Sequence, residues 1–265
     1  MPCLATSSAS GRKLHPTPNV LFHLKRYLNA WSRHHRSGGF GIHSPYAYQF
    51  VRNVWRQRLP YYAYEGIQQL LDTIASSTTR RQRSEMDIIS EREARLLFRV
   101  TNFFNPQRIL QVGAATGVES IAMLEVNRQS RLYLYDPQLE QKALAVRVLQ
   151  SQLDRVECYN DTDVAVSEML EAGDSPMMAL MNTPVDETLL KRLLDAQCVL
   201  VLRNLNRDEE MSNLFDVCCE HMTMGQTYTN NKIAIVNPNP KLQREDFLLW
   251  LYSSRAHTIK TAQAN

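Results

Sequence analysis

The chain has 265 residues, 44% of them hydrophobic and 22% charged, a composition typical of a globular protein that buries its core without disulfides. No apolar run in the sequence approaches the ~20 residues of a membrane-spanning helix, and the first residues lack the pattern of a signal peptide. The five cysteines show no CxxC or Cys/His metal spacing. We therefore expect a cytoplasmic protein with reduced thiols and no membrane association.

The net charge of +3 is unevenly distributed. Residues 1–60 contain nine Lys and Arg and no Asp or Glu, which leaves a net charge of −6 for the remainder. The first 64 residues also hold 11 of the 22 aromatic residues. Three roles are open for this basic, aromatic-rich part: a lid over an active site, a nucleic-acid-binding surface, or a solvated face that needs no partner.

Apolar residues at helical spacing predict four helices in the N-terminal part. These helices begin near Asn19, Ser44, Glu65 and Ser90. Pro45 suits the first position of the second helix, which should bury Phe50, Val51, Val54 and Trp55. Ser90 and Glu93 form a capping box, and the polar stretch 76–83 predicts a loop.

After Pro106 short apolar runs alternate with helical stretches, which predicts βαβ units and a parallel sheet covered on both faces. The five predicted parallel strands are residues 108–112, 131–135, 155–159, 177–181 and 198–202. Two more strand-like runs, 226–229 and 232–236, flank Asn230-Asn231 and predict a closing hairpin. A short helix over 243–252 is expected after it.

Residues 111–117, Gln-Val-Gly-Ala-Ala-Thr-Gly, resemble motif I of class I S-adenosylmethionine-dependent methyltransferases, which reads acid-x-Gly-x-x-x-Gly after strand one. Five βα units and a closing hairpin are also the order of that superfamily. The strings Gly-Ile-His-Ser-Pro-Tyr at 41–46 and Arg-Leu-Leu-Phe-Arg at 95–99 resemble a bacterial group of small O-methyltransferase-like proteins. The resemblance covers about residues 40–252.

This resemblance implies an α/β fold: a Rossmann-like methyltransferase sheet of five parallel strands plus a C-terminal antiparallel hairpin, with an N-terminal helical extension. The expected organisation is a disordered tail (1–18), the basic helical extension or lid (19–94), the methyltransferase domain (95–253) and a tail (254–265). S-adenosylmethionine is the implied cofactor. Its expected binding residues are Gln111, Gly113, Ala114, Gly117, Asp136, Asp161, Thr162 and Asn182.

Several of these positions have an alternative interpretation. Gly113 and Gly117 allow close approach of the backbone to a ligand, but a tight turn without a ligand would also use them. Asp136 follows the glycines by about 20 residues, where an acid accepts hydrogen bonds from ribose, yet it also suits a helix cap. Asp161 or Thr162 lies where the family binds adenine, while Asp163 is a candidate cap for the next helix.

The chain departs from the family pattern at the motif acids. Gln111 replaces the usual acid of motif I, and it cannot pair with the charged amino group of the methionyl moiety. The ends of strands four and five, which hold magnesium in metal-dependent relatives, carry Asn182, Arg203 and Asn204 instead of carboxylates. We therefore expect no metal. Arg203 and Asn204 either bind an anionic substrate group or pair with an acid such as Asp208.

His43 is the candidate general base, because an imidazole takes up a proton near neutral pH, although it could simply order its turn. Tyr46 and Tyr48 either line a substrate pocket or pack in the core. Three functions remain open: a small-molecule methyltransferase, with O-methyl transfer favoured; a methyltransferase-fold binding protein that has lost catalysis; and a nucleic-acid methyltransferase.

Overall fold

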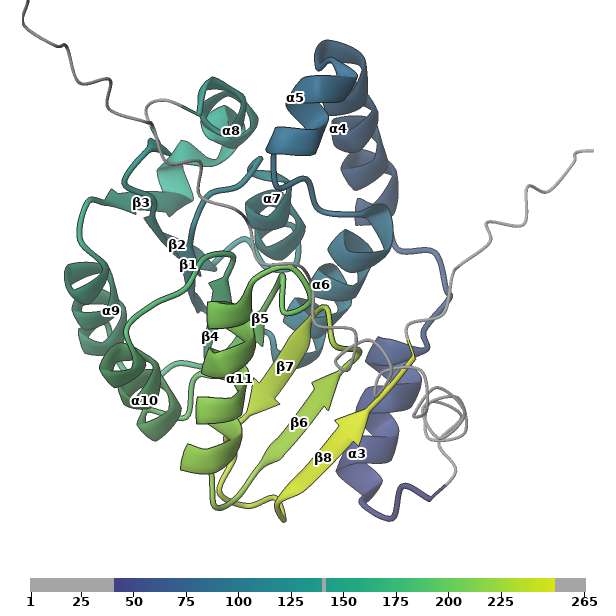
Figure 1. Ribbon diagram of the computed structural model, residues 1–265, viewed down its shortest axis with the longest axis vertical. Coiled ribbons are helices and arrows are strands. Elements are labelled where there is room, and N and C mark those ends of the chain that lie inside the picture. Colours follow the sequence, from purple (N-terminus) through teal and green to yellow (C-terminus); the bar gives the residue numbers. More distant parts are fainter. Residues whose placement is uncertain (1–40, 140–141, 251–265) are drawn as a thin grey trace, which may run out of the picture.

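The computed structural model describes residues 41–139 and 142–250, and within them eight strands form one sheet in the order β3-β2-β1-β4-β5-β7-β6-β8 (Figure 1). The strands are β1 (Arg108–Val112), β2 (Arg131–Tyr135), β3 (Val156–Tyr159), β4 (Met177–Met181), β5 (Val199–Leu202), β6 (Gln226–Thr229), β7 (Ala234–Asn237) and β8 (Glu245–Leu248). Strands β1 to β5 are parallel, and β7 pairs antiparallel with both β5 and β6. The predicted Rossmann-like sheet and hairpin are confirmed. The predicted tails and the helix from Asn19 lie outside the described residues.

Helices cover both faces of the sheet, as expected for strands whose residues are buried on both sides. One apolar core includes residues of α6 (Glu91–Phe104), α7 (Val118–Leu124) and α8 (Ala143–Leu149). The other includes residues of α9 (Thr162–Glu171), α10 (Glu187–Asp195) and α11 (Glu209–His221), on the opposite side in Figure 1. All five residues of β1 are buried, and the strand reads as an apolar run except for Arg108 and Gln111.

The part of the basic N-terminal extension that the structure describes packs into the first core. Its buried residues come mainly from α3 (Pro45–Phe50), the π-helix η1 (Val51–Trp55) and α4 (Ala63–Ser77). The Ser44 hydroxyl caps α3 through the amide of Ala47, as the sequence predicts. Phe50 stacks on Tyr228 of β6 with ring centroids 4.1 Å apart. The predicted domain boundary between residues 94 and 95 falls inside α6, which packs on α4, η1 and α7.

The predicted loop over 76–83 is wrong. Helix α4 continues to Ser77, and α5 (Arg80–Glu85) begins directly afterwards. Its N-cap is Thr79, whose hydroxyl accepts a hydrogen bond from the Gln82 backbone amide, while the side-chain oxygen of Gln82 accepts one from the Thr79 backbone amide. The Thr-x-x-Gln spacing of this capping box is visible in the sequence, but the polar and basic character of the segment favoured the prediction of a loop.

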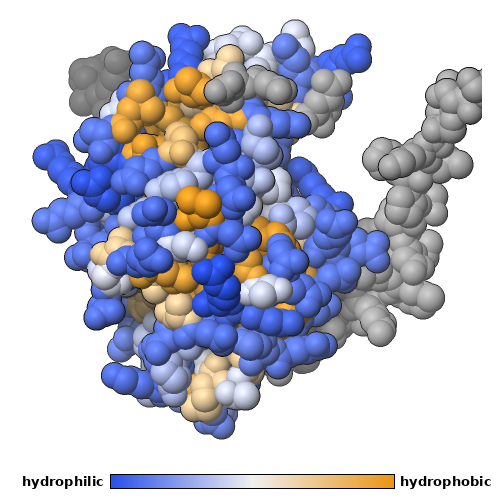
Figure 2. Space-filling view, turned by 90° about the vertical axis from the view of Figure 1, so that its left-hand side faces the viewer, coloured by the Kyte–Doolittle hydropathy of each residue, from blue (hydrophilic) through white to orange (hydrophobic). Residues whose placement is uncertain are grey.

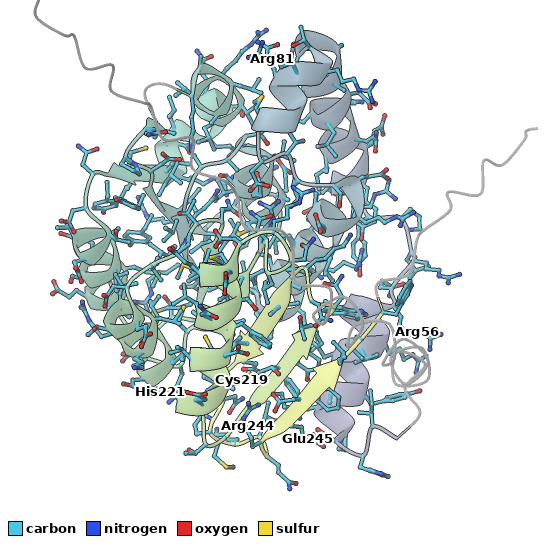
Figure 3. The ribbon with its side chains drawn as sticks, viewed as in Figure 1. Arg56, Arg81, Cys219, His221, Arg244 and Glu245 are labelled. Atoms are coloured by element: carbon cyan, nitrogen blue, oxygen red, sulfur yellow. The ribbon has the colours of Figure 1, made fainter. Side chains whose placement is uncertain are left out.

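The predicted final helix over 243–252 is also wrong, because residues 245–248 form β8, parallel to β6. Phe247 stacks on Tyr228 at 5.1 Å between centroids. Arg244, just before β8, donates to the Cys219 carbonyl oxygen of α11 at 3.2 Å (Figure 3). A short apolar run in a sequence can form either a strand or a helix. Here residues 245–248 form a strand because they pair with the edge of β6 that does not face β7.

The surface that carries α8 and α9 is mostly hydrophilic, with apolar side chains in separate groups (Figure 2). Exposed apolar residues of that region include Val146, Leu153 and Val164. Within the described residues, no helix is both long and apolar enough to cross a bilayer. Cys198 is buried in the core, whereas Cys158 on strand β3 is exposed because this strand lies at the edge of the sheet.

The packing of Phe50 predicts that the N-terminal extension contributes to global stability. Phe50 is fully buried, so Phe50→Ala should lower the free energy of unfolding by about 3–5 kcal/mol, as cavity formation in a core does. Urea denaturation measures this loss. Tyr48→Ala, on the same helix but 44% exposed, is the control and should change stability far less. Equal small losses in both variants would show that the extension is not part of the cooperative unit.

Candidate functional site

The topology brings the ends of β1, β4 and β5 together at one edge of the sheet. After β1 the chain adds β2 and β3 on one side and then places β4 on the other, so a topological switch point lies between β1 and β4. Open α/β sheets bind ligands at the carboxyl ends of their strands at such a point. The backbone hydrogen bonds between these strands continue one residue beyond their ends. Asn182 N donates to Val112 O at 2.9 Å, and Arg203 N donates to Met181 O at 3.0 Å.

The β1–α7 loop is shaped by its two glycines. Gly113 and Gly117 have φ angles of 85° and 82°, which other residues adopt with strain. A Cβ on Gly113 would lie 3.2 Å from Cγ2 of Thr183, and one on Gly117 would lie 3.2 Å from Cβ of Val148. On the side where a Cβ would stand, both glycines therefore pack against other residues of the protein.

Gln111 holds the loop in place. Its buried amide donates to the Gly113 carbonyl oxygen at 3.0 Å and accepts from the Ser120 hydroxyl at 2.7 Å. A carboxylate at this position could not donate the bond to Gly113. The replacement of the motif acid by glutamine thus has a structural role in the turn.

Asp136 is anchored at the end of β2, with only 3% of its side chain exposed. Its Oδ2 accepts from Ala114 N at 2.7 Å and from Lys142 Nζ at 2.6 Å, and its Oδ1 accepts from Gln138 N at 2.9 Å. Burial by itself would raise the pKa of Asp136, but the Lys142 ammonium and the two backbone amides together lower it. The carboxylate is ionised and retains acceptor capacity on Oδ1. It does not cap α8 (Ala143–Leu149), whose N-cap is Lys142.

A buried network spans the ends of β4 and β5. Arg203, 3% exposed, donates from Nη1 to Glu119 Oε1 and to Asn182 Oδ1, both at 2.7 Å. Asn182 in turn donates to the Gly113 carbonyl oxygen at 2.7 Å. Asp87, from the segment between α5 and α6, accepts from Arg203 and from the Asn204 amide at 3.2 and 3.0 Å. Arg203 is therefore paired with acids, but with Glu119 and Asp87 instead of the expected Asp208, which caps α11.

Two polar atoms at this edge are buried without a hydrogen-bond partner among the described residues: Oε2 of Glu119 and Oγ1 of Thr116. Burial raises the pKa of Glu119 to about 7, against the lowering effect of the Arg203 guanidinium. Glu119 lies in the first turn of α7 and is fully buried. A buried carboxyl that titrates near neutrality marks a candidate functional position.

The end of β3 lies on the other side of β2. Asp161 caps α9 by accepting from Val164 N at 3.1 Å, so it takes the capping role considered for Asp163. Asp163 pairs with Arg192 on the surface at 3.0 Å. Thr162 is the first residue of α9 and is partly exposed.

His43 does not join this site. It is exposed beside Ser44, whose hydroxyl accepts from the Gln226 amide at 3.1 Å. Gln226 begins β6 and pairs with Asn237, the end of β7, which lies at the amino end of β5. The structure therefore places His43 at the opposite edge of the sheet.

The two tyrosines near His43 lie in the same region. Tyr46 packs edge-on against Phe103 at 5.7 Å between centroids and accepts from Asn237 through its hydroxyl. Tyr48 is exposed. Neither tyrosine reaches the carboxyl edge, and the packing of Tyr46 agrees with the core interpretation.

Sequence reasoning missed Glu119, Asp87 and Lys142. Glu119 carried a weak signal, since it is an acid two residues after Gly117 on a helix whose other residues are largely apolar. No pattern in the sequence pointed to Asp87, because its partner Arg203 lies 116 residues away along the chain. In the described ranges, no group of three or more His, Cys, Asp or Glu side chains is arranged to hold a metal ion.

No protein-family model matches this chain, and no curated protein matches its sequence. Similar solved structures include a methyltransferase from Geobacter sulfurreducens, with 20% identity, a TM-score of 0.49, and coverage of 68% of this chain and 92% of that one. An O-methyltransferase from Bacillus cereus in complex with SAH shows 12% identity, a TM-score of 0.47, and coverage of 68% and 92%. The SAH-bound methyltransferase PaMTH1 from Podospora anserina shows 11% identity, a TM-score of 0.48, and coverage of 86% and 99%. At these identities the likeness concerns the fold, and the function must be argued from the site.

Glu119 should make stability depend on pH. Its folded pKa of about 7 exceeds the ordinary value of 4.5, so its stabilising contribution is complete below pH 4.5 and is lost as the pH rises through 7. At about 1.4 kcal/mol per unit, the loss is at most about 3 kcal/mol. Urea denaturation between pH 5 and 8 should show that Glu119→Gln flattens this dependence, whereas Glu187→Gln on the surface of α10 does not. Parallel curves for the wild type and Glu119→Gln would contradict the assignment.

Proposed function

We propose that this protein is an S-adenosylmethionine-dependent methyltransferase that methylates an oxygen of a small molecule without a metal ion. The observation that carries the proposal is the carboxylate of Asp136, which is ionised, buried and oriented by Ala114 N and Gln138 N at the end of β2. It stands beside the switch point, where open α/β sheets bind nucleoside ligands. The unpartnered hydroxyl of Thr116 in the adjacent β1–α7 loop also fits a polar ligand at this place.

Residues at the ends of several strands would bind the cofactor together. Asp136 accepts hydrogen bonds from ribose hydroxyls, and Lys142, whose side chain is 34% exposed, moves aside to free Oδ2. Gln111, Gly113 and Asn182 hold the loop through the bonds described above. Asp161 and Thr162, at the end of β3, remain the proposed contacts of the adenine ring.

If bound at this edge, S-adenosylmethionine would supply a methyl group on its sulfonium sulfur; the bond from that carbon to sulfur would be replaced by a bond to the acceptor oxygen, and the electron pair would remain on sulfur. The protein must hold the acceptor in line and accept its proton. His43 is at the other edge of the sheet, so we assign the proton to Oε2 of Glu119. Its pKa near 7 suits this role, and the Arg203 guanidinium on Oε1 fixes the carboxylate.

A second candidate is a cofactor-binding protein that has lost catalysis. It is favoured by the fact that Gln111, Asn182 and Asp136 already have hydrogen-bond partners within the protein. Such a protein would bind the cofactor and transfer no methyl group. The nucleic-acid alternative depends on residues 1–60, most of which lie outside the described residues.

Calorimetric titration with S-adenosylhomocysteine tests the cofactor. We expect a Kd in the micromolar range or below, weakened in Asp136→Asn by about 1.5–3 kcal/mol, as loss of hydrogen bonds to a charged group implies. Asp186→Asn is the matched control, because Asp186, like Asp136, accepts from the backbone amide two residues later but is exposed. A folded wild type that binds no ligand at millimolar concentration would refute the cofactor assignment and leave the fold intact.

Methyl transfer to a panel of small hydroxylated molecules should be insensitive to EDTA, since the ends of β4 and β5 carry Asn182, Arg203 and Asn204. Its rate should rise with pH around 7 as Glu119 ionises, and Glu119→Gln should abolish this rise while leaving the affinity for S-adenosylhomocysteine intact. Activity lost in EDTA and restored by Mg²⁺ would overturn the metal-free assignment.

A further inference from the structure

We propose that Arg203 and Asn204 form a receptor for the carboxylate of an acidic small molecule, and that the side chain of Asp87 fills this receptor when no such molecule is bound. As a statement about the methyl acceptor, the inference rests on the proposed function. As a statement about carboxylate binding, it stands on the geometry of the three residues alone.

Three donor nitrogens converge on the Asp87 carboxylate. Arg203 Nη1 and Asn204 Nδ2 reach Oδ2 at 3.2 and 3.0 Å, and Arg203 Nη2 reaches Oδ1 at 3.4 Å. A planar guanidinium that meets both oxygens is the geometry in which arginine recognises carboxylates. The two guanidinium distances exceed the ~2.7–2.9 Å of a strong charge-assisted bond. The bonds from Arg203 to Asp87 are therefore weaker than the 2.7 Å bonds from Arg203 to Glu119 and Asn182.

The receptor itself is rigid. Glu119 Oε1 and Asn182 Oδ1 each accept a hydrogen bond from Arg203 Nη1 at 2.7 Å. Arg203 is 3% exposed, so its guanidinium needs no reordering to receive a ligand. A group fixed in this way binds with a smaller entropy cost than a free surface arginine.

Asp87 is the exchangeable member. It lies in the short segment between α5 and α6, and its side chain is 29% exposed, in contrast to the buried Arg203. Replacing one carboxylate by another leaves the charge of the cluster unchanged. With a neutral ligand Arg203 would keep Glu119 but lose Asp87 as an acidic partner, so an acid is the chemical class that fits.

The receptor also has a suitable position. It lies at the end of β5 and is linked through Asn182 to the carbonyl oxygen of Gly113, while Asp136 lies on the β2 side of the same loop. A molecule anchored here by its carboxylate would sit beside the proposed cofactor. It would take the place of the Asp87 side chain on Arg203 and Asn204.

Calorimetric titration of the full chain with sodium benzoate, without cofactor, tests the receptor. Asp87→Ala removes the internal competitor and should bind benzoate at least tenfold more tightly than the wild type. Benzamide, the neutral isostere, should show no such gain. Asp163→Ala is the matched control, because it breaks an exposed Asp–Arg pair at 3.0 Å away from the site and should bind benzoate like the wild type.

Thermal denaturation supplies a second readout. Acetate should raise the Tm of Asp87→Ala by refilling the receptor and should leave Asp163→Ala unchanged. If Asp87→Ala does not fold, Asp87→Asn, which keeps the shape and removes the charge, is titrated instead. Equal benzoate affinity in the wild type and the folded Asp87 variant, or no binding by either, would overturn the receptor. Benzoate binding in a protein that fails to bind S-adenosylhomocysteine would keep the receptor and reject the methyltransferase.

Discussion

The buried guanidinium of Arg203 ties together the segments that build the carboxyl edge of the sheet. Through it β5 meets Asn182 after β4, Glu119 on α7 and Asp87 before α6. Removing one partner of a buried ion pair leaves an uncompensated charge, and this costs more free energy than the intact pair contributes to stability. The positions of these segments therefore depend on one another. The geometry of the candidate site follows from this constraint.

The same constraint explains how the site departs from the motif that it resembles. Gln111 closes the β1–α7 loop through Gly113 and Ser120, and Asn182 binds the same carbonyl oxygen as Gln111. An acid, Glu119, lies eight residues after Gln111 on α7, where burial raises the pKa of its carboxyl to about 7. Its fully buried carboxyl keeps one oxygen unpartnered, which is costly for a purely structural residue and is expected where a ligand or a proton is handled.

The described part of the N-terminal extension is continuous with the core on one face of the sheet. Arg99 of α6 donates to the Val54 carbonyl oxygen and to the Tyr64 hydroxyl, so α6 binds both η1 and α4. The segment between α5 and α6 then brings Asp87 to the carboxyl edge. The extension thus combines a packing role in α3 and α4 with a role at the site.

The sequence alone determined the layout of the fold, since buried parallel strands read as apolar runs and helices as periodic ones: β1, β2 and β4 were predicted with their observed bounds. It also located Gln111, Asp136, Asn182 and Arg203 at strand ends, because parallel strands end at one edge. The strand β8 forms through its pairing with β6, a tertiary contact. The helix α5 begins at the Thr79–Gln82 capping box, which the prediction of a loop did not take into account. Only the tertiary structure could pair Arg203 with Asp87 and Glu119, or place His43 at the far edge, because such contacts join residues far apart in the chain and leave no periodic trace in it.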